Sequence, residues 1–408
     1  MFIFQETCKL LNDKNIIEEQ HKKVKRSSAV LLIIALVAIL VGCRQGANPV
    51  WVEEPEPAET IVEEITYPID ILAIEIPVME IVIEEEEPEP EEEEIVLENE
   101  NLLTGLPDLS DEAIGKRPVA VMVSNLQMDL PQHGIGQADI LFEIPLAGGL
   151  TRLMAVYGDY TRVPRIIPVR SVRLYFPPFA LSFDSIFVYW GGDTSIIPAV
   201  EALGMEKFSG IFNTGGLFGR DAGRASAGFG LEHQAYFDGT RLVDTMQALG
   251  MRSEATENFA RPAFLFHPPG ELVAPDGEVS TSVHINFGGV NATLVYDEET
   301  HKYLKQMNGQ PHVDGTTGET LAFTNVLVLE TPIWVNAIGH HEMNWAGGES
   351  YGGYYISHGV RQRITWRKEG GNERSPLQFF DLEGYELRIN RGKIYIAVNN
   401  PGQVTFEP

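Results

Sequence analysis

The sequence predicts an α+β fold, with a mixed α/β N-terminal domain followed by a mostly antiparallel β C-terminal domain. Runs such as 118–125 are short, apolar and rich in β-branched residues, which is typical of buried strands, and helical patterns are few. After residue 281, short segments of alternating apolar and polar residues are separated by Gly, Asp and Asn, as in a meandering antiparallel sheet.

Acidic residues are concentrated in one part of the chain. The 408 residues include 58 Asp and Glu against 30 Lys and Arg, which gives a formal net charge of −28. Residues 51–100 alone hold 20 of the acidic residues and no Lys or Arg. Binding to nucleic acid needs clustered cations, so the composition argues against a nucleic-acid partner.

The first 43 residues carry the features of an export signal. A basic patch ends at Arg26, and an apolar run of 13 residues covers 29–41. This run is shorter than the roughly 20 residues that a membrane-spanning helix needs, and it has the length of the apolar part of a signal peptide. The tetrad Leu40-Val41-Gly42-Cys43 resembles the bacterial lipobox, in which the cysteine thiol receives the lipid.

We therefore expect a lipoprotein signal peptide over 1–43, with Cys43 as the lipidated N-terminus and fatty acids such as palmitate as the anchor. The expected location is extracytoplasmic, on the bacterial cell membrane. The alternative is an uncleaved membrane anchor with an incidental cysteine.

Residues 44–100 are predicted to form an acidic, Glu/Pro-rich disordered tether, because dense like charge and proline prevent collapse. The segment 69–84 alternates in part between apolar and acidic residues, which would also suit a strand that pairs with the folded part. We favour disorder there, because Pro77 interrupts the segment and acidic residues surround it.

The N-terminal domain is expected over 101–252. Gly148-Gly149 separates two of its predicted strands and indicates a hairpin. The predicted strands are 118–125, 138–146, 150–158 and 185–192, and the predicted helices are 195–203 and 240–249, the latter ended by Gly250.

A polar, Pro-rich connector is expected over 253–280 and the C-terminal domain over 281–408. The predicted strands of this domain are 283–288, 292–297, 301–307, 325–331, 362–368, 385–390 and 393–399.

Several segments resemble the YerB-like lipoprotein family, which is built on the N- and C-terminal halves of domain of unknown function 3048. They are GQADILFEIPLAGGLTRLMAVYGD (136–159), IPVRSVRLYF (167–176), GRDAGR (219–224), GQPHVDGTTGETLAFTNVLVL (309–329) and YGGYYISHGVRQRITWRK (351–368). The resemblance covers most of 101–400. It implies a bacterial lipoprotein with an α+β N-terminal domain and a β-rich C-terminal domain, and it implies no activity. Where the family has a Pro-His-Asn-Leu-Tyr-like segment, this chain has Glu232-His233-Gln234-Ala235-Tyr236, so Gln replaces the Asn.

Five arginines of the N-terminal domain are candidate ligand-binding residues, because guanidinium groups bind carboxylate or phosphate in bidentate geometry. We expect Arg170 and Arg173 at a loop-to-helix boundary, where free backbone N–H groups would add donors for an anion. The alternative is that the arginines form internal salt bridges with Glu143, Asp159, Asp184, Asp193 and Asp221. The five arginines are Arg152, Arg170, Arg173, Arg220 and Arg224.

A second candidate set combines Glu143, Asp221 and His233, since a carboxylate beside histidine can act in acid–base chemistry or bind a metal. The spacing of these three residues matches no known metal-binding motif. The spacings of His312 with Asp314 and of His340-His341-Glu342 do not match one either. Both cysteines precede residue 50, and no phosphate-binding or dinucleotide-binding fingerprint is present. We therefore expect no metal, no cofactor and no catalytic residue.

Three functions remain open from the sequence. The preferred hypothesis is a non-catalytic lipoprotein that binds an anionic envelope ligand, such as a cell-wall polymer, or an envelope protein. The second is an envelope hydrolase or transferase that uses Glu143, Asp221 and His233, which requires these residues to converge. The third is a scaffold that binds another protein through an exposed apolar patch.

The lipid anchor gives a first prediction. Replacing Cys43 with Ala removes the only thiol in the lipobox, so the variant should move from the membrane fraction to the soluble fraction when cells are fractionated. Continued membrane retention of the Cys43→Ala protein would indicate an uncleaved anchor instead.

Overall fold

Residues 97–408 are described by a computed structural model, and they belong to one compact unit. The predicted signal peptide, Cys43 and nearly all of the predicted tether lie outside the described residues. The unit has its own hydrophobic core, so residues 88–408 can be studied without the preceding segment.

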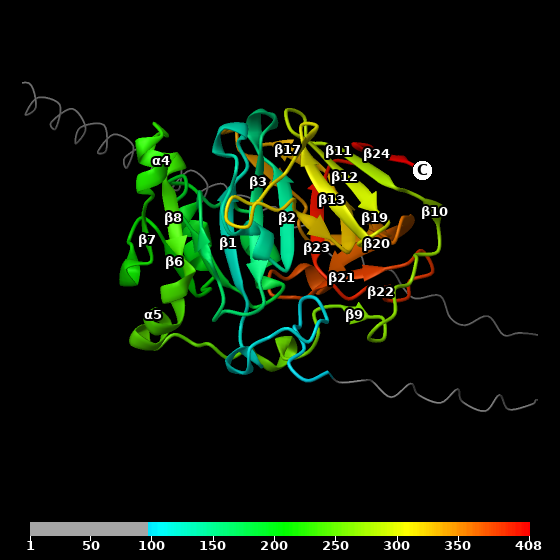
Figure 1. The fold of residues 1–408 in the computed structure, drawn as a ribbon, viewed down its shortest axis with the longest axis horizontal. Coiled ribbons are helices and arrows are strands. Elements are labelled where there is room, and N and C mark those ends of the chain that lie inside the picture. The colour runs from blue at the N-terminus through cyan, green and yellow to red at the C-terminus, as the bar shows by residue number, and fades with distance from the viewer. Residues whose placement is uncertain (1–96) are drawn as a thin grey trace, which may run out of the picture. The chain divides into compact units, whose positions relative to one another are not determined.

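The main feature of the fold is an 11-stranded mixed sheet to which both halves of the chain contribute (Figure 1). Strand β2 from the N-terminal half lies parallel to β23 from the C-terminal half, with Phe142 opposite Ile396. In spatial order the strands are β10 (Glu278–Val279), β20 (Val360–Lys368), β19 (Gly347–Ser357), β16 (Asn325–Glu330), β23 (Ile394–Asn399), β2 (Ile140–Pro145), β3 (Thr151–Tyr157), β1 (Val119–Ser124), β5 (Ile186–Tyr189) and β6 (Lys207–Ser209), and β21 (Leu377–Phe380) also pairs with β20.

The described residues are α+β, as predicted, but the two predicted domains share this sheet. The 253–280 segment contributes to it as well, because β10 pairs with β20. The hairpin predicted at Gly148-Gly149 is confirmed by the antiparallel pairing of β2 with β3, and both glycines have the positive φ that such a turn requires.

Smaller sheets complete the structure. A six-stranded sheet is entirely antiparallel, as expected for the C-terminal half, and comprises β14 (Gln310–Pro311), β13 (Lys302–Met307), β12 (Asn291–Asp297), β11 (Ser282–Asn286), β24 (Val404–Glu407) and β15 (Ala322–Phe323). A three-stranded sheet comprises β4 (Arg165–Ile166), β8 (Ala235–Asp238) and β7 (Phe218–Arg220). Two further sheets have two strands each: β17 (Ile333–Val335) with β18 (His341–Met343), and β22 (Arg388–Ile389) with β9 (Leu265–Phe266).

The described helices are short: α2 (Phe176–Leu181), α3 (Ile197–Ala202), α4 (Ala222–Ser226) and α5 (Leu242–Leu249). The helices predicted at 195–203 and 240–249 are confirmed as α3 and α5, and Gly250 ends α5 in the left-handed conformation. Strand β19 was not predicted, because its glycines lower its intrinsic strand preference; it forms between β16 and β20, which supply the missing hydrogen bonds.

Both faces of the central sheet are buried. In β1, Val119, Val121 and Val123 join one core cluster, which includes residues of β11 and β12. The intervening Ala120 and Met122 join a second cluster, which includes the aromatic residues of α2. Because both faces are covered, the strand is apolar throughout rather than alternating.

A closed ring of buried polar side chains joins the two halves. Glu143 on β2 accepts hydrogen bonds from Asn125 Nδ2 at 2.9 Å and from Lys305 Nζ at 3.0 Å. His312 connects Lys305 at 3.1 Å to Gln132 at 2.9 Å, and Gln132 donates to Asn125 Oδ1 at 3.0 Å, which closes the ring. All five side chains are fully buried.

The ring is satisfied at every position. Burial, and then the charge of Lys305, hold the pKa of His312 well below its usual value, so the imidazole of His312 is neutral. Its Nδ1 then accepts from Lys305 and its Nε2–H donates to Gln132, which is the only tautomer that fits both contacts. Thr151 and Tyr395 donate to the remaining positions of the Glu143 carboxylate, at 2.9 and 2.8 Å.

We predict that Lys305→Met lowers the free energy of unfolding by about 3–5 kcal/mol, because it leaves the Glu143 carboxylate buried without a cation. Urea unfolding of residues 88–408 measures this. The control is Lys302→Met, which changes an exposed lysine on the same strand and should alter stability by less than about 0.5 kcal/mol. Equal stability of the Lys305→Met and wild-type proteins would contradict the role assigned to the ion pair.

Candidate functional site

The candidate site lies at one edge of the central sheet. Strands β1, β2, β5 and β6 run in the same direction, as the parallel and antiparallel pairings require, so their carboxyl ends share this edge. In open, mostly parallel α/β sheets, ligands bind outside the carboxyl ends of the strands, and β1, β5 and β6 form a parallel part of this mixed sheet. Ser124 ends β1 here, and Trp190 follows β5.

Four arginines gather at this edge and are called the arginine cluster: Arg152, Arg170, Arg173 and Arg220. Arg152 lies near the start of β3, and Arg220 ends β7. Their charges act on one another, since Arg173 and Arg170 lower the pKa of Arg152 and Arg170 lowers that of Arg220, in both cases after the larger effect of burial. The structure therefore brings together four of the five predicted arginines.

Arg152 is the most buried member of the arginine cluster, with 7% of its surface exposed. One of its nitrogens donates to the Ser171 carbonyl at 2.8 Å, whereas its Nε has no hydrogen-bond partner among the described residues. Burial, followed by repulsion from Arg173 and Arg170, lowers the pKa of Arg152 to about 9. The group is still charged at neutral pH, so within 97–408 it has a buried N–H donor without an acceptor and no carboxylate at ion-pair distance.

The expected helix N-terminus does not supply donors here. Residues 170–173 belong to no helix or strand, and α2 begins only at Phe176. Pro177 and Pro178 occupy its first turn and have no N–H group, so the prediction of a loop-to-helix anion site at Arg170 and Arg173 was wrong in this respect. The two arginines face the site from an irregular segment instead.

Asp129 is a fully buried carboxylate behind the arginine cluster. His233 Nδ1 lies 2.6 Å from Asp129 Oδ1, and Arg170 Nη2 lies 2.9 Å from the same histidine nitrogen. Arg170 is also 3.6 Å from Asp129 Oδ2, an oxygen without a hydrogen-bond partner among the described residues. Asp129 therefore stabilises the inner side of the site, where His233 and Arg170 meet.

Arg224 has a structural role. It donates to the carbonyls of Asp129 at 2.8 Å and Pro131 at 2.5 Å, and to that of His233 at 3.3 Å. These three acceptors occupy its guanidinium group. Arg224 thus fixes the loop that carries Asp129. The sequence analysis named Arg224 as a ligand-binding candidate, but these contacts leave its guanidinium group unavailable to a ligand.

Arg220 and Arg173 are the accessible members of the arginine cluster. Arg220 lies over the ring of Trp190, 4.1 Å from its centre, in a cation–π contact. Arg173 is half-buried and donates to the carbonyl of its neighbour Val172 at 2.9 Å. Two exposed carboxylates, Asp193 and Glu232, influence this region: Glu232 acts on Arg220, and Asp193 lies near enough to Arg173 for the two charges to interact.

Among the described ion pairs, none joins the five arginines to the carboxylates named in the alternative, but Arg170 and Arg224 form internal salt bridges with Asp129 instead, at 3.6 and 3.8 Å. Asp184 pairs with Arg117 and Arg252 instead, at 3.3 and 2.7 Å, and Asp159 pairs with Arg162. The arginine cluster is thus not neutralised by the carboxylates named for it.

Glu143, Asp221 and His233 do not form one site. Glu143 is saturated within the buried ring. Asp221 caps the short helix α4 and lies 3.3 Å from Arg165, while His233 contacts Asp129. The geometry of the described residues therefore does not supply the convergence that the hydrolase or transferase hypothesis required.

Comparison with known proteins places the chain in a family. The model described as "Protein of unknown function (DUF3048) N-terminal domain" matches residues 103–252, and that for the corresponding C-terminal domain matches residues 283–396. Together they cover more than half of the chain. The protein belongs to the DUF3048 family.

A relative and a solved structure agree with this assignment. YerB of Bacillus subtilis (strain 168), which is named as a candidate lipoprotein, is 28% identical over 276 residues, covering 66% of this chain and 78% of YerB. The crystal structure of YerB from Bacillus subtilis has the same fold, with a TM-score of 0.63 at 23% identity, and the match covers 75% of this chain and 98% of the YerB chain.

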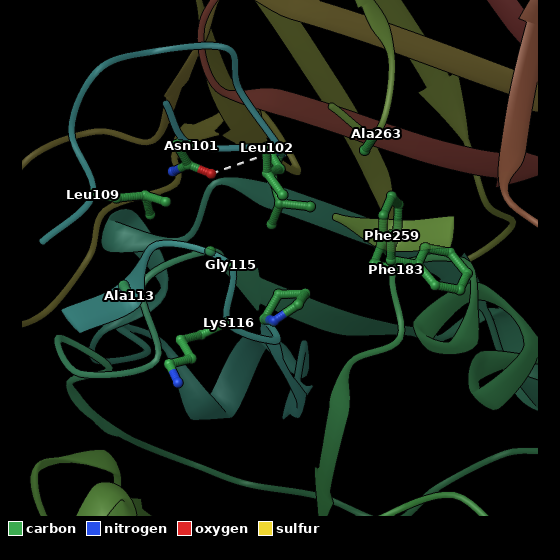
Figure 2. Close-up of a pocket in the computed structure, with 12 residues that line it drawn as sticks. Asn101, Leu102, Leu109, Ala113, Gly115, Lys116, Phe183, Phe259 and Ala263 are labelled. Atoms are coloured by element: carbon green, nitrogen blue, oxygen red, sulfur yellow. Dashed lines mark hydrogen bonds between the residues drawn. The ribbon is translucent and has the colours of Figure 1, made fainter. Parts of the chain in front are cut away.

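Within this DUF3048 protein, two cavities are less suited to an anion. The first, lined by Asn101, Leu102, Lys116 and Phe183 among others, is drawn in Figure 2. It leaves a volume of about 30 Å³ for the centres of water-sized groups. The second, of about 440 Å³, lies beside β10 and β20, where Arg361 and Arg363 are already paired with Glu278 and Glu330.

Among residues 97–408, no helix is long and apolar enough to cross a membrane, and no group of three or more His, Cys, Asp or Glu residues is arranged to hold a metal ion.

Asp129 was not predicted as a site residue from the sequence. The signal that could have found it is its isolation, since it is the only charged residue between 126 and 132.

We predict that Asp129→Asn lowers the free energy of unfolding by about 3 kcal/mol, because it removes the buried negative charge beside Arg170, Arg224 and His233. Urea unfolding measures the change. The matched control is Asp221→Asn, which should cost less than about 1 kcal/mol, because Asn also caps helices and the partner Arg165 is exposed. Similar losses for the two variants would contradict the role given to Asp129.

Proposed function

We propose that this protein is a non-catalytic binding module of the bacterial cell envelope, and that its arginine cluster binds an anionic group of an envelope ligand. A phosphate or a carboxylate fits the chemistry, since both accept paired hydrogen bonds from guanidinium. The observation that carries the proposal is the buried Arg152 Nε, which has no partner among the described residues while two further guanidinium groups repel it.

The energetic argument is direct. Leaving a buried donor unpaired costs about 1–3 kcal/mol, and more for a charged group. Arg152 and the neighbouring Arg170 and Arg173 have one buried carboxylate, Asp129, behind them. A bound anion would pair the Arg152 N–H and reduce the mutual repulsion of the guanidinium groups, so its binding should be favourable.

The proposed location at the bacterial membrane rests on the predicted signal sequence and on the name of a relative. The lipobox at Cys43 favours lipid anchoring in the bacterial membrane with the folded unit outside it, and the name of the relative YerB agrees with such an anchor. The acidic segment before residue 97 would then separate the binding module from the membrane. Cell-wall polymers and envelope proteins both offer anionic groups that could reach the arginine cluster.

We predict that inorganic phosphate raises the melting temperature of residues 88–408 relative to chloride at the same ionic strength. At 100 times its dissociation constant, phosphate should add about 2.7 kcal/mol of stability. The change should be lost in Arg173→Ala, because among the described residues its side chain donates one hydrogen bond, to the carbonyl of the neighbouring Val172, and its removal should leave the fold intact.

The control is Arg162→Ala, an exposed arginine that pairs with Asp159 away from the arginine cluster. It should keep the full phosphate response. If phosphate gives no stabilisation, or if Arg162→Ala removes it as effectively as Arg173→Ala, the arginine cluster is not the anion site.

A further inference from the structure

Exposed apolar side chains surround the arginine cluster. Four of them, called the apolar rim, are Leu174, Ile211, Phe212 and Leu231, with 37%, 63%, 75% and 68% of their surfaces exposed. Single exposed apolar residues are common on protein surfaces, whereas contiguous apolar patches rimmed by polar residues mark interaction sites.

The apolar rim is attached directly to the arginine cluster. Leu174 follows Arg173 in the chain. The carbonyl of Leu231 accepts a hydrogen bond from Arg220 at 2.5 Å. The backbone around Leu231 is therefore held by a guanidinium group of the arginine cluster, while its side chain is left to solvent.

The loop after β6 brings Ile211 and Phe212 to the same place. A side chain on Gly210 would collide with the ring of Trp190, so this loop passes close over the residue on which Arg220 stacks. Ile211 also packs against Gly191, where an added Cβ would lie 3.0 Å from the Ile211 side chain. Glycine at 191 and 210 thus permits the close approach of the apolar loop to the cationic edge.

The C-terminal half adds a further apolar element. The β17–β18 hairpin exposes Trp334 and Ile338, at 47% and 65%. His340, which leads into β18, lies 3.8 Å from Asp193, the carboxylate that also interacts with Arg173. The hairpin therefore approaches the same edge of the sheet from the other half of the chain.

We propose that the ligand of the arginine cluster is a phosphate-bearing lipid, with its phosphate on the guanidinium groups and its hydrocarbon chain on the apolar rim. This inference rests on the proposed anion-binding function and names its ligand class. A simple polyanion would gain nothing from exposed Ile, Phe and Leu, and an uncharged lipid would leave Arg152 Nε unpaired. Only a ligand with both groups uses both parts of the surface.

The test compares n-octyl phosphate, below its micellar concentration, with methyl phosphate, which has the same head group. Calorimetric titration of residues 88–408 should give at least tenfold tighter binding of octyl phosphate, the gain expected from burial of about two methylene groups. Leu231→Ser should reduce this gain to less than threefold and leave methyl phosphate binding unchanged. Leu382→Ser, a matched control with 66% exposure beside the other cavity, should keep the full gain.

The outcomes separate this inference from the function on which it rests. Equal affinity for octyl and methyl phosphate would overturn the lipid inference and leave the anion site standing. Binding of octyl phosphate that is unaffected by Arg173→Ala would show adsorption through the chain alone and would also overturn it. If neither compound binds, both the inference and the proposed function fail.

Discussion

The buried ion pair between Glu143 and Lys305 is the interaction on which the arrangement of this protein depends. Each charge would be costly to bury alone, and together they are tolerated only because His312, Gln132 and Asn125 satisfy the remaining donors and acceptors. The ring joins β2 of the N-terminal half to β13 of the C-terminal half, beside the carboxyl end of β1. The two sequence regions are therefore locked as one body at the edge that carries the arginines.

The electrostatics of the two neighbouring clusters differ in a way that indicates function. In the buried ring every charge and polar atom is paired. Arg152 directly follows Thr151, which donates to Glu143 of this ring. Among the described residues, the Nε–H of Arg152 has no acceptor and its guanidinium group has no carboxylate at ion-pair distance. The chain does pair its arginines elsewhere, for example Arg117 with Asp184 and Arg363 with Glu330. The deficit at the arginine cluster is thus local, and an external anion is the simplest group that would correct it.

Much of the fold followed from local patterns, because strands and turns are encoded by nearby residues. The hairpin at Gly148-Gly149 and the end of α5 at Gly250 are examples. Local patterns could not predict that the N- and C-terminal halves are joined by the Glu143–Lys305 ion pair. These two residues are far apart in sequence, and neither stands in a recognisable motif. The same limit explains why Glu143 was taken for a ligand-binding residue. The grouping of Arg152, Arg170, Arg173 and Arg220 was predictable from residue type, but the partners of Asp129 and the structural role of Arg224 required the tertiary structure.

The most direct test of the central claim is anomalous diffraction from crystals of residues 88–408 grown with tungstate, a heavy tetrahedral anion. The arginine cluster should hold a tungsten peak, with an oxygen of the anion within hydrogen-bond distance of Arg152 Nε and of at least one of Arg170 and Arg173. A structure in which tungstate binds only elsewhere, and in which Arg152 Nε is bonded to a protein oxygen, would contradict the claim that this edge of the sheet is an anion site.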